Sequence, residues 1–144
     1  PIEDILNANR IKFKTHHYRY LKPEVIASAD KVIICGTSLA DNLFIDEIKS
    51  FKWLESFHKP VLGICGGAHI IGLLLGEKVK KNTEIGMKKI KLTKPFLDVS
   101  GEIEAYFLHQ LQYLPEVFHE GHLYATLFHP EVRNQEMIVN FAKI

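Results

Sequence analysis

A single cysteine in a glycine-rich turn is the first feature of the chain that could do covalent chemistry. The residues Gly63-Ile64-Cys65-Gly66-Gly67 join an apolar run that ends at Ile64 to another that begins at Ile70. Small flanking residues permit a sharp, strained strand-to-helix turn, which pushes its central side chain into the cleft above a sheet. The positive end of the following helix favours the thiolate form of Cys65, and the backbone N–H of Gly66 can bind an oxyanion. The pattern predicts a nucleophile, although a small buried side chain in such a turn would have the same sequence.

A nucleophile of this kind needs a base and a group that orients the base, and one segment near the C-terminal end offers both. The apolar run 123–128 is followed at once by His129, Pro130 and Glu131. Pro130 ends the strand and fixes the backbone, which holds the two polar side chains on the same side of the loop. His129 can then face Cys65 while Glu131 holds its other nitrogen. An ordinary turn at the end of a strand is the alternative interpretation of these three residues.

The elements that must position these residues alternate between helix and strand in the first half of the chain. Apolar spacing predicts a buried helix after the cysteine turn and further helices at 1–9, 23–29, 44–58 and 136–144. Continuous or alternating apolar runs predict strands at 11–15, 32–35, 61–64, 87–92, 103–108 and 123–128. This order predicts an α/β fold, a three-layer sandwich with a mixed, mostly parallel sheet.

Length and composition are those of one compact globular domain. The chain has 144 residues, of which 47% are hydrophobic and 24% charged, so we predict a single domain over residues 1–144. An open α/β sheet usually starts with a buried strand, whereas this chain starts with a helix. We therefore expect the usual first strand to be absent or to lie upstream of Pro1.

Net charge, the length of the apolar runs and the cysteine content argue against nucleic-acid binding, membrane spanning and a disulfide-stabilised secreted protein. The net charge of +1 gives no field that would attract nucleic acid, and the lysines at 78–91 have no interleaved aromatic residues. No apolar run is long enough to span a membrane. The two cysteines are too few for a disulfide framework, and no secretory signal opens the chain, so a reducing, cytoplasmic setting is expected.

The two motifs together resemble the class I glutamine amidotransferases. The resemblance rests on "GICGG" after a buried strand and on "FHPEV" with "NF" close behind, and it runs from about Lys31 to the C-terminus. The GMP synthase type looks nearest, followed by the anthranilate and aminodeoxychorismate type. The resemblance implies a flavodoxin-like fold and a triad of Cys65, His129 and Glu131 that hydrolyses glutamine. It also implies that the partner is an ammonia-accepting synthetase subunit, and that no metal and no organic cofactor is needed.

Two further segments agree with the family pattern in part. "TEIG" at 83–86 resembles the family's Glu-x-Gly segment, and "FLHQ" at 107–110 lies where the family has a Ser-His segment lining the glutamine site. The resemblance therefore implies substrate contacts from Leu108 and His109, with Gly67 and His69 on the helix after the turn. Leu108 stands where the family has Ser, and His69 stands where it has a Gln that helps to hold glutamine.

The oxyanion hole departs from the family pattern as well. Gly66 is implied as one donor, and Gly36 as the other, but "CGTS" at 35–38 replaces the family's Gly-Gly-Pro-Gly loop. These departures leave three functions open. The first is a glutamine-hydrolysing amidotransferase subunit, favoured because all three triad residue types are kept. The second is a catalytically weak or inactive binding or regulatory module, and the third is a cysteine hydrolase of another γ-glutamyl or amide substrate.

Overall fold

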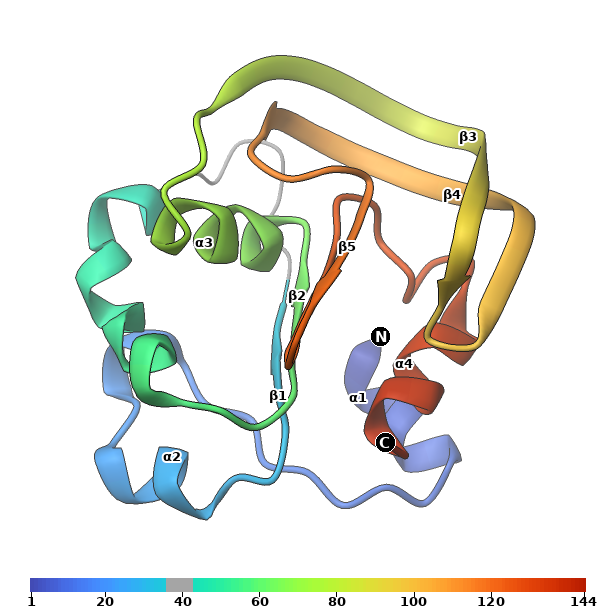
Figure 1. The fold of residues 1–144 in the computed structure, drawn as a ribbon. Coiled ribbons are helices and arrows are strands. Elements are labelled where there is room, and N and C mark those ends of the chain that lie inside the picture. The colour runs from blue at the N-terminus through green and yellow to red at the C-terminus, as the bar shows by residue number, and fades with distance from the viewer. Residues whose placement is uncertain (36–42) are drawn as a thin grey trace.

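A four-stranded sheet lies between two layers of helices (Figure 1). The computed structural model describes residues 1–35 and 43–144. The strands of the sheet are, in order, β1 (Val32–Ile34), β2 (Val61–Ile64), β6 (Leu123–Thr126) and β5 (Val117–Glu120). β1, β2 and β6 are parallel, and β5 pairs with β6 in the antiparallel direction. The predicted α/β sandwich with a mixed, mostly parallel sheet is confirmed.

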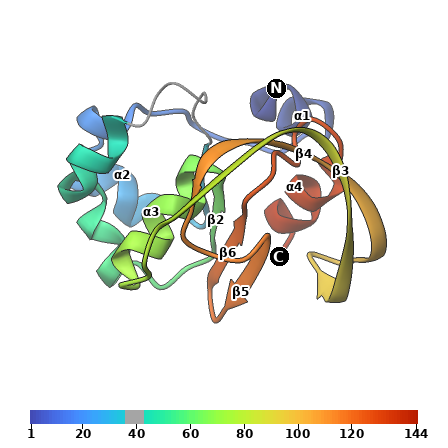
Figure 2. The same cartoon turned by 90° about the horizontal axis from the view of Figure 1, so that it is seen from above.

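Helices cover both faces of this sheet, and each face has its own apolar core. β2 contributes to both, because alternate side chains of a strand point to opposite faces: Val61 enters one core, and Leu62 and Ile64 enter the other. The Val61 face is covered by η2 (Leu43–Ser56) and α3 (Gly66–Leu74), with η1 (Tyr18–Tyr20) and α2 (Pro23–Ser28) at its margin. The opposite face is covered by α1 (Ile2–Ala8) and α4 (Gln135–Ala142) (Figure 2). Within residues 1–35 and 43–144, every helix is too short or too polar to cross a lipid bilayer.

A long antiparallel ribbon of β3 (Lys80–Phe96) and β4 (Val99–Gln112) is separate from the main sheet and arches over one end of it (Figure 1). Its inner face is anchored by apolar packing, since Ala105 and Phe107 are buried and the Phe107 ring lies 5.8 Å from that of Phe128. The strands predicted at 87–92 and 103–108 lie inside this ribbon. Alternation in a sequence marks a half-buried strand but does not say which sheet the strand joins.

Some elements differ from the sequence predictions. Residues 11–15 form no strand: Ile11 is partly buried against the core, but Phe13 is 36% exposed, so the two apolar side chains do not share a buried face. The helix predicted at 44–58 is a 3-10 helix, η2, which fits the repeat of its apolar residues. Ile48, Phe51, Leu54 and Phe57 recur every third position, and a 3-10 helix has three residues per turn. The short strand β5 was not predicted.

Candidate active site

Cys65 lies on a strained turn between β2 and α3. Its backbone has φ +50° and ψ −97°, a conformation that costs free energy for a residue with a side chain. Two hydrogen bonds hold the turn: the Cys65 N–H donates to the Thr126 carbonyl over 2.8 Å, and the His69 N–H donates to the Cys65 carbonyl over 3.0 Å. The Cys65 backbone is therefore hydrogen-bonded to the neighbouring strand β6 on one side and to the first turn of α3 on the other.

The glycines around Cys65 are required by close backbone packing. A Cβ atom on Gly63 would lie 2.6 Å from the carbonyl carbon and oxygen of Gly67, and one on Gly67 would lie 2.3 Å from the Ile34 carbonyl oxygen of β1. Such distances are below van der Waals contact, so no larger residue fits without backbone movement. Gly66, the expected oxyanion donor, is the buried first residue of α3. Gly36, the other expected donor, lies outside the described residues.

His129 and Glu131 come together immediately after β6. The His129 N–H donates to the Tyr106 carbonyl of β4 over 2.8 Å, which places the histidine against the ribbon. Its Nδ1 lies 3.3 Å from the Glu131 carboxylate, and the two side chains are only 11% and 12% exposed. The expected orientation of the imidazole by the carboxylate is thus present in the geometry.

The electrostatics of His129 link it to Cys65. Burial alone would lower the pKa of His129, but the neighbouring Cys65 sulfur and the Glu131 carboxylate outweigh burial and raise the pKa to about 10. The His129 Nε2 has no hydrogen-bond partner among the described residues. The Cys65 thiol instead donates a long hydrogen bond of 3.5 Å to the Leu108 carbonyl. Nε2 is thus available to exchange a proton with the nearby sulfur or with a substrate.

Leu108 and His109 bring the ribbon into the site, as their position in the family pattern implied. The Leu108 carbonyl faces Cys65, while the His109 side chain is buried on the inner face of β4. The His109 Nε2–H donates to the Glu84 carboxylate over 3.2 Å, and Lys88 pairs with the same carboxylate at 2.8 Å. Burial lowers the pKa of His109, and Glu84 offsets part of this effect. Sequence reasoning assigned no role to Glu84, although it lies in the recognised Glu-x-Gly segment.

His69 is a neutral, buried imidazole one turn of α3 after the cysteine. It is 3% exposed, and its ring lies 5.5 Å from that of Tyr113. Burial and, to a smaller extent, the charge of His109 lower the pKa of His69 to about 4. The side chain therefore presents an uncharged donor and acceptor at neutral pH, as the amide of a glutamine would.

The lowered pKa of His69 predicts a loss of stability in acid. Between about pH 6.5 and pH 4 the unfolded chain binds a proton at His69 that the folded protein does not bind, so the free energy of unfolding falls as the pH falls. From pH 7 to pH 5 this one group should remove about 2 kcal/mol. We expect His69→Gln to abolish that part of the pH dependence in urea unfolding. An unchanged pH dependence would contradict the prediction, and the exposed His16→Gln is the control.

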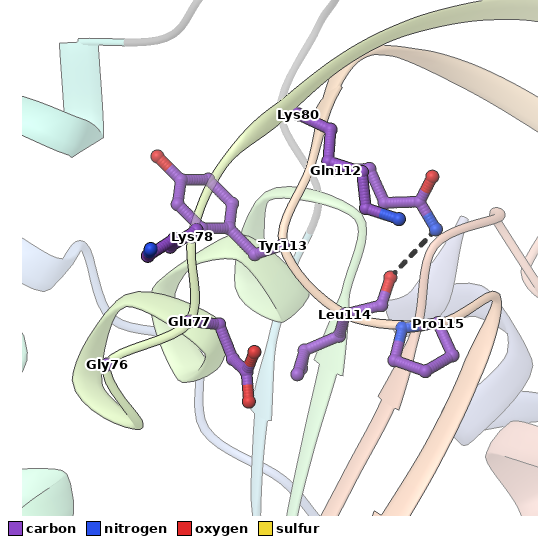
Figure 3. Close-up of a pocket in the computed structure, with 8 residues that line it drawn as sticks. All are labelled: Gly76, Glu77, Lys78, Lys80, Gln112, Tyr113, Leu114 and Pro115. Atoms are coloured by element: carbon purple, nitrogen blue, oxygen red, sulfur yellow. Dashed lines mark hydrogen bonds between the residues drawn. The ribbon is translucent and has the colours of Figure 1, made fainter.

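A separate pocket of about 550 Å³ lies at the base of the ribbon (Figure 3). It is lined by Gly76, Glu77, Lys78, Lys80, Gln112, Tyr113, Leu114 and Pro115. Its Gln112 amide is occupied within the protein, donating to the Leu114 carbonyl over 3.0 Å and accepting from Asn82 over 2.7 Å. Since none of the predicted site residues within 1–35 and 43–144 line this pocket, we do not assign it to the candidate active site.

The α/β fold with a cysteine on the turn between β2 and α3 is typical of one class of protein. The chain belongs to the glutamine amidotransferase class-I family. Residues 2–121 match the profile of that family. The match includes Cys65 and the ribbon and ends before His129. The family resemblance predicted from the sequence is therefore confirmed.

Individual relatives place the chain within this family. It is 26% identical over 137 residues to a subunit of the glutamine-hydrolyzing GMP synthase of Picrophilus torridus, in an alignment that covers 78% of this chain and 73% of the relative. It is 30% identical over 86 residues to the imidazole glycerol phosphate synthase subunit HisH of Vibrio cholerae, over 55% of this chain and 42% of that protein. Both relatives are subunits of synthases.

Solved structures share the fold at low sequence identity. The crystal structure of a protein described as a GMP synthase subunit from Thermoplasma acidophilum superposes with a TM-score of 0.85 at 21% identity, over 97% of this chain and 84% of that one. A glutamine amidotransferase from Thermotoga maritima gives a TM-score of 0.67 at 18% identity, over 90% of this chain and 69% of the other.

Proposed function

We propose that this chain hydrolyses glutamine with a Cys65-His129-Glu131 triad and supplies the ammonia to a synthase subunit. One observation carries the proposal: a cysteine on a strained turn and a histidine whose Nδ1 is held by a carboxylate contact carbonyl groups two residues apart on β4. The cysteine sulfur also helps to raise the pKa of that histidine. This is the arrangement that nucleophilic catalysis requires. Family membership supports it, because class I amidotransferases act on the side-chain amide of glutamine.

The proposed reaction proceeds in two steps. The Cys65 thiolate attacks the amide carbon, and the resulting oxyanion is stabilised by the backbone N–H of Gly66 and, in our proposal, by that of Gly36. His129 gives its proton to the leaving nitrogen, so the carbon–nitrogen bond breaks and ammonia departs from a thioester. His129 then takes a proton from water, which attacks the thioester and releases glutamate and Cys65. Glu131 keeps the imidazole in the orientation that both steps need.

Substrate contacts are proposed for the residues that surround the cysteine. The segment at Leu108 and His109 lies against Cys65, and His69 supplies an uncharged imidazole from α3. Gly67 leaves space only for backbone between α3 and β1, so any contact from it to a substrate is through its peptide group. The neutral state of His69 suits an uncharged amide better than a carboxylate.

Similarity to the relatives supports a proposal for the partner and for the reaction that uses the ammonia. The relatives are subunits of synthases, and the longer of the two alignments is to a subunit of a GMP synthase. We propose GMP synthesis as the reaction that consumes the ammonia, and the partner is then the synthase subunit that accepts it. The proposal invokes no metal and no organic cofactor, since the triad chemistry uses only protein groups and water.

The test is glutaminase activity of the purified chain, measured as glutamate release, together with labelling by 6-diazo-5-oxo-L-norleucine. Mass spectrometry should locate the label on Cys65. Asparagine and γ-glutamyl-p-nitroanilide, offered in parallel, distinguish a glutaminase from a hydrolase of another amide. Absence of both turnover and labelling in the folded protein would overturn the proposal in favour of a binding or regulatory module.

A further inference from the structure

One edge of β4 contacts three separate parts of the candidate site. The carbonyl groups of Glu104, Tyr106 and Leu108 accept hydrogen bonds from Asn134 Nδ2 at 2.8 Å, from the His129 N–H at 2.8 Å and from Cys65 Sγ at 3.5 Å. Residues two apart on a strand present their backbone groups to the same edge. The positions of Cys65 and His129 relative to each other are therefore fixed by hydrogen bonds to the same edge of β4.

Asn134 differs from the other two residues because its side chain does not cap the helix that it precedes. It is the N-cap residue of α4, where an asparagine side chain ordinarily accepts a hydrogen bond from the first turn, but no such bond is made. The side chain reaches across to β4 instead, and the residue is only 5% exposed. Its backbone N–H donates to the Pro130 carbonyl over 2.9 Å, and its carbonyl accepts from Met137 over 3.0 Å.

The segment from His129 to Asn134 is tied together internally. The Val132 N–H donates to the His129 carbonyl over 3.1 Å, and the Gln135 side chain donates to the Glu131 carbonyl over 3.1 Å. These bonds restrict motion within the segment. Its hydrogen bonds to β4 come from the His129 N–H and the Asn134 side chain, and an exposed Arg133–Glu104 ion pair at 3.5 Å lies beside them. The buried bond of Asn134 therefore helps to fix the direction of the segment as well as its position.

We propose that Asn134 is a positioning residue that sets the His129 imidazole relative to Cys65 by anchoring the His129–Asn134 segment to β4. This inference rests on the proposed triad. It assigns no contact with substrate to Asn134. Proton transfer depends steeply on the separation of donor and acceptor, so a small rotation of the segment is expected to have a large effect.

The charges around His129 allow this effect to be measured. In the part of the chain that the structure describes, the ionisable groups that act on its ring are Cys65 and Glu131, with the Tyr106 ring centroid at 6.2 Å. A Glu104–Arg133 pair at 3.5 Å lies next along the strand edge. A neutral replacement of Asn134 leaves all these groups in the chain. A change in the His129 titration would then report a change in its distance from Cys65 or Glu131.

The experiment compares Asn134→Ser with Asn140→Ser, both in a Cys35→Ser background that removes the exposed second thiol. Serine is also a good N-cap residue but is too short to reach β4. Asn140 is the matched control, because its Nδ2 donates to the Leu97 carbonyl over 2.7 Å from the other end of α4. Thermal unfolding measures the stability that each variant loses. NMR titration of His129 and the rate of Cys65 alkylation by iodoacetamide at pH 7 measure the site.

We expect Asn134→Ser to lower the midpoint of the His129 titration by about one pH unit and to slow alkylation about tenfold. Asn140→Ser should change neither, at a similar loss of thermal stability. Equal titrations and rates in the two folded variants would overturn the role of Asn134 alone. An ordinary His129 titration in the unsubstituted protein would overturn the triad and this role with it. Asn134→Thr, another neutral and short N-cap residue, replaces the serine variant if that does not fold.

Discussion

Replacing Cys65 with alanine is expected to abolish glutamine hydrolysis, with kcat falling by about 10⁴-fold or more. The thiolate is the only group in the proposed mechanism that forms the covalent intermediate, and neither His129 nor water can take its place within the same geometry. The loss should not come from unfolding. Alanine fits the space of the 3%-exposed cysteine and adopts φ +50° with a similar strain, so the free energy of unfolding should change little.

The measurement is glutamate release by the purified variant, with the denaturation midpoint determined on the same preparation. Cys35→Ala is the control for folding, since it removes the other cysteine, which is exposed, and should leave the denaturation midpoint unchanged. Cys65→Ala also tests the interaction between His129 and Cys65. The pKa of His129 should fall in this variant, because the sulfur is one of the two groups that raise it to about 10. Turnover by a folded Cys65→Ala protein would show that another group attacks the substrate.

Replacing Gly67 with alanine is expected to lower the free energy of unfolding by about 3 kcal/mol or more. The added methyl group would lie 2.3 Å from the Ile34 carbonyl oxygen. That atom belongs to the backbone of β1, which pairs with β2, so it cannot move aside as a flexible side chain could. Relief requires α3 to shift away from the sheet, and α3 begins directly after Cys65.

Gly72→Ala provides a graded comparison on the same helix. Its added methyl group would lie 2.5 Å from the Tyr113 Cβ atom, which can move only with its backbone. Tyr113 lies just after β4 rather than inside a paired strand, so we expect a smaller loss of stability than for Gly67→Ala. Urea unfolding of both variants measures the difference. A Gly67→Ala protein as stable as the unsubstituted chain would refute the close packing of α3 on β1.

The local features of the fold were predictable from consecutive residues. The apolar run 61–64, the glycines around Cys65 and the apolar run after them together predict a strand, a tight turn and a helix, because each depends on spacing within a few positions. The resemblance to class I amidotransferases came from two short motifs, and the family match confirms it. The roles of Cys65, His129 and Glu131 stay predictions until activity is measured.

Features that depend on which segments meet were decided only by the tertiary structure. The alternation at 87–92 and 103–108 predicts two strands. It does not predict that they pair with each other as a ribbon apart from the main sheet. The alternation at 11–15 is equally regular, yet these residues form no strand in the structure. Likewise, Asn134 in the sequence is an ordinary residue before a helix. Its contact with Glu104 spans 30 positions, and no local spacing encodes a contact that arises when distant segments pack together.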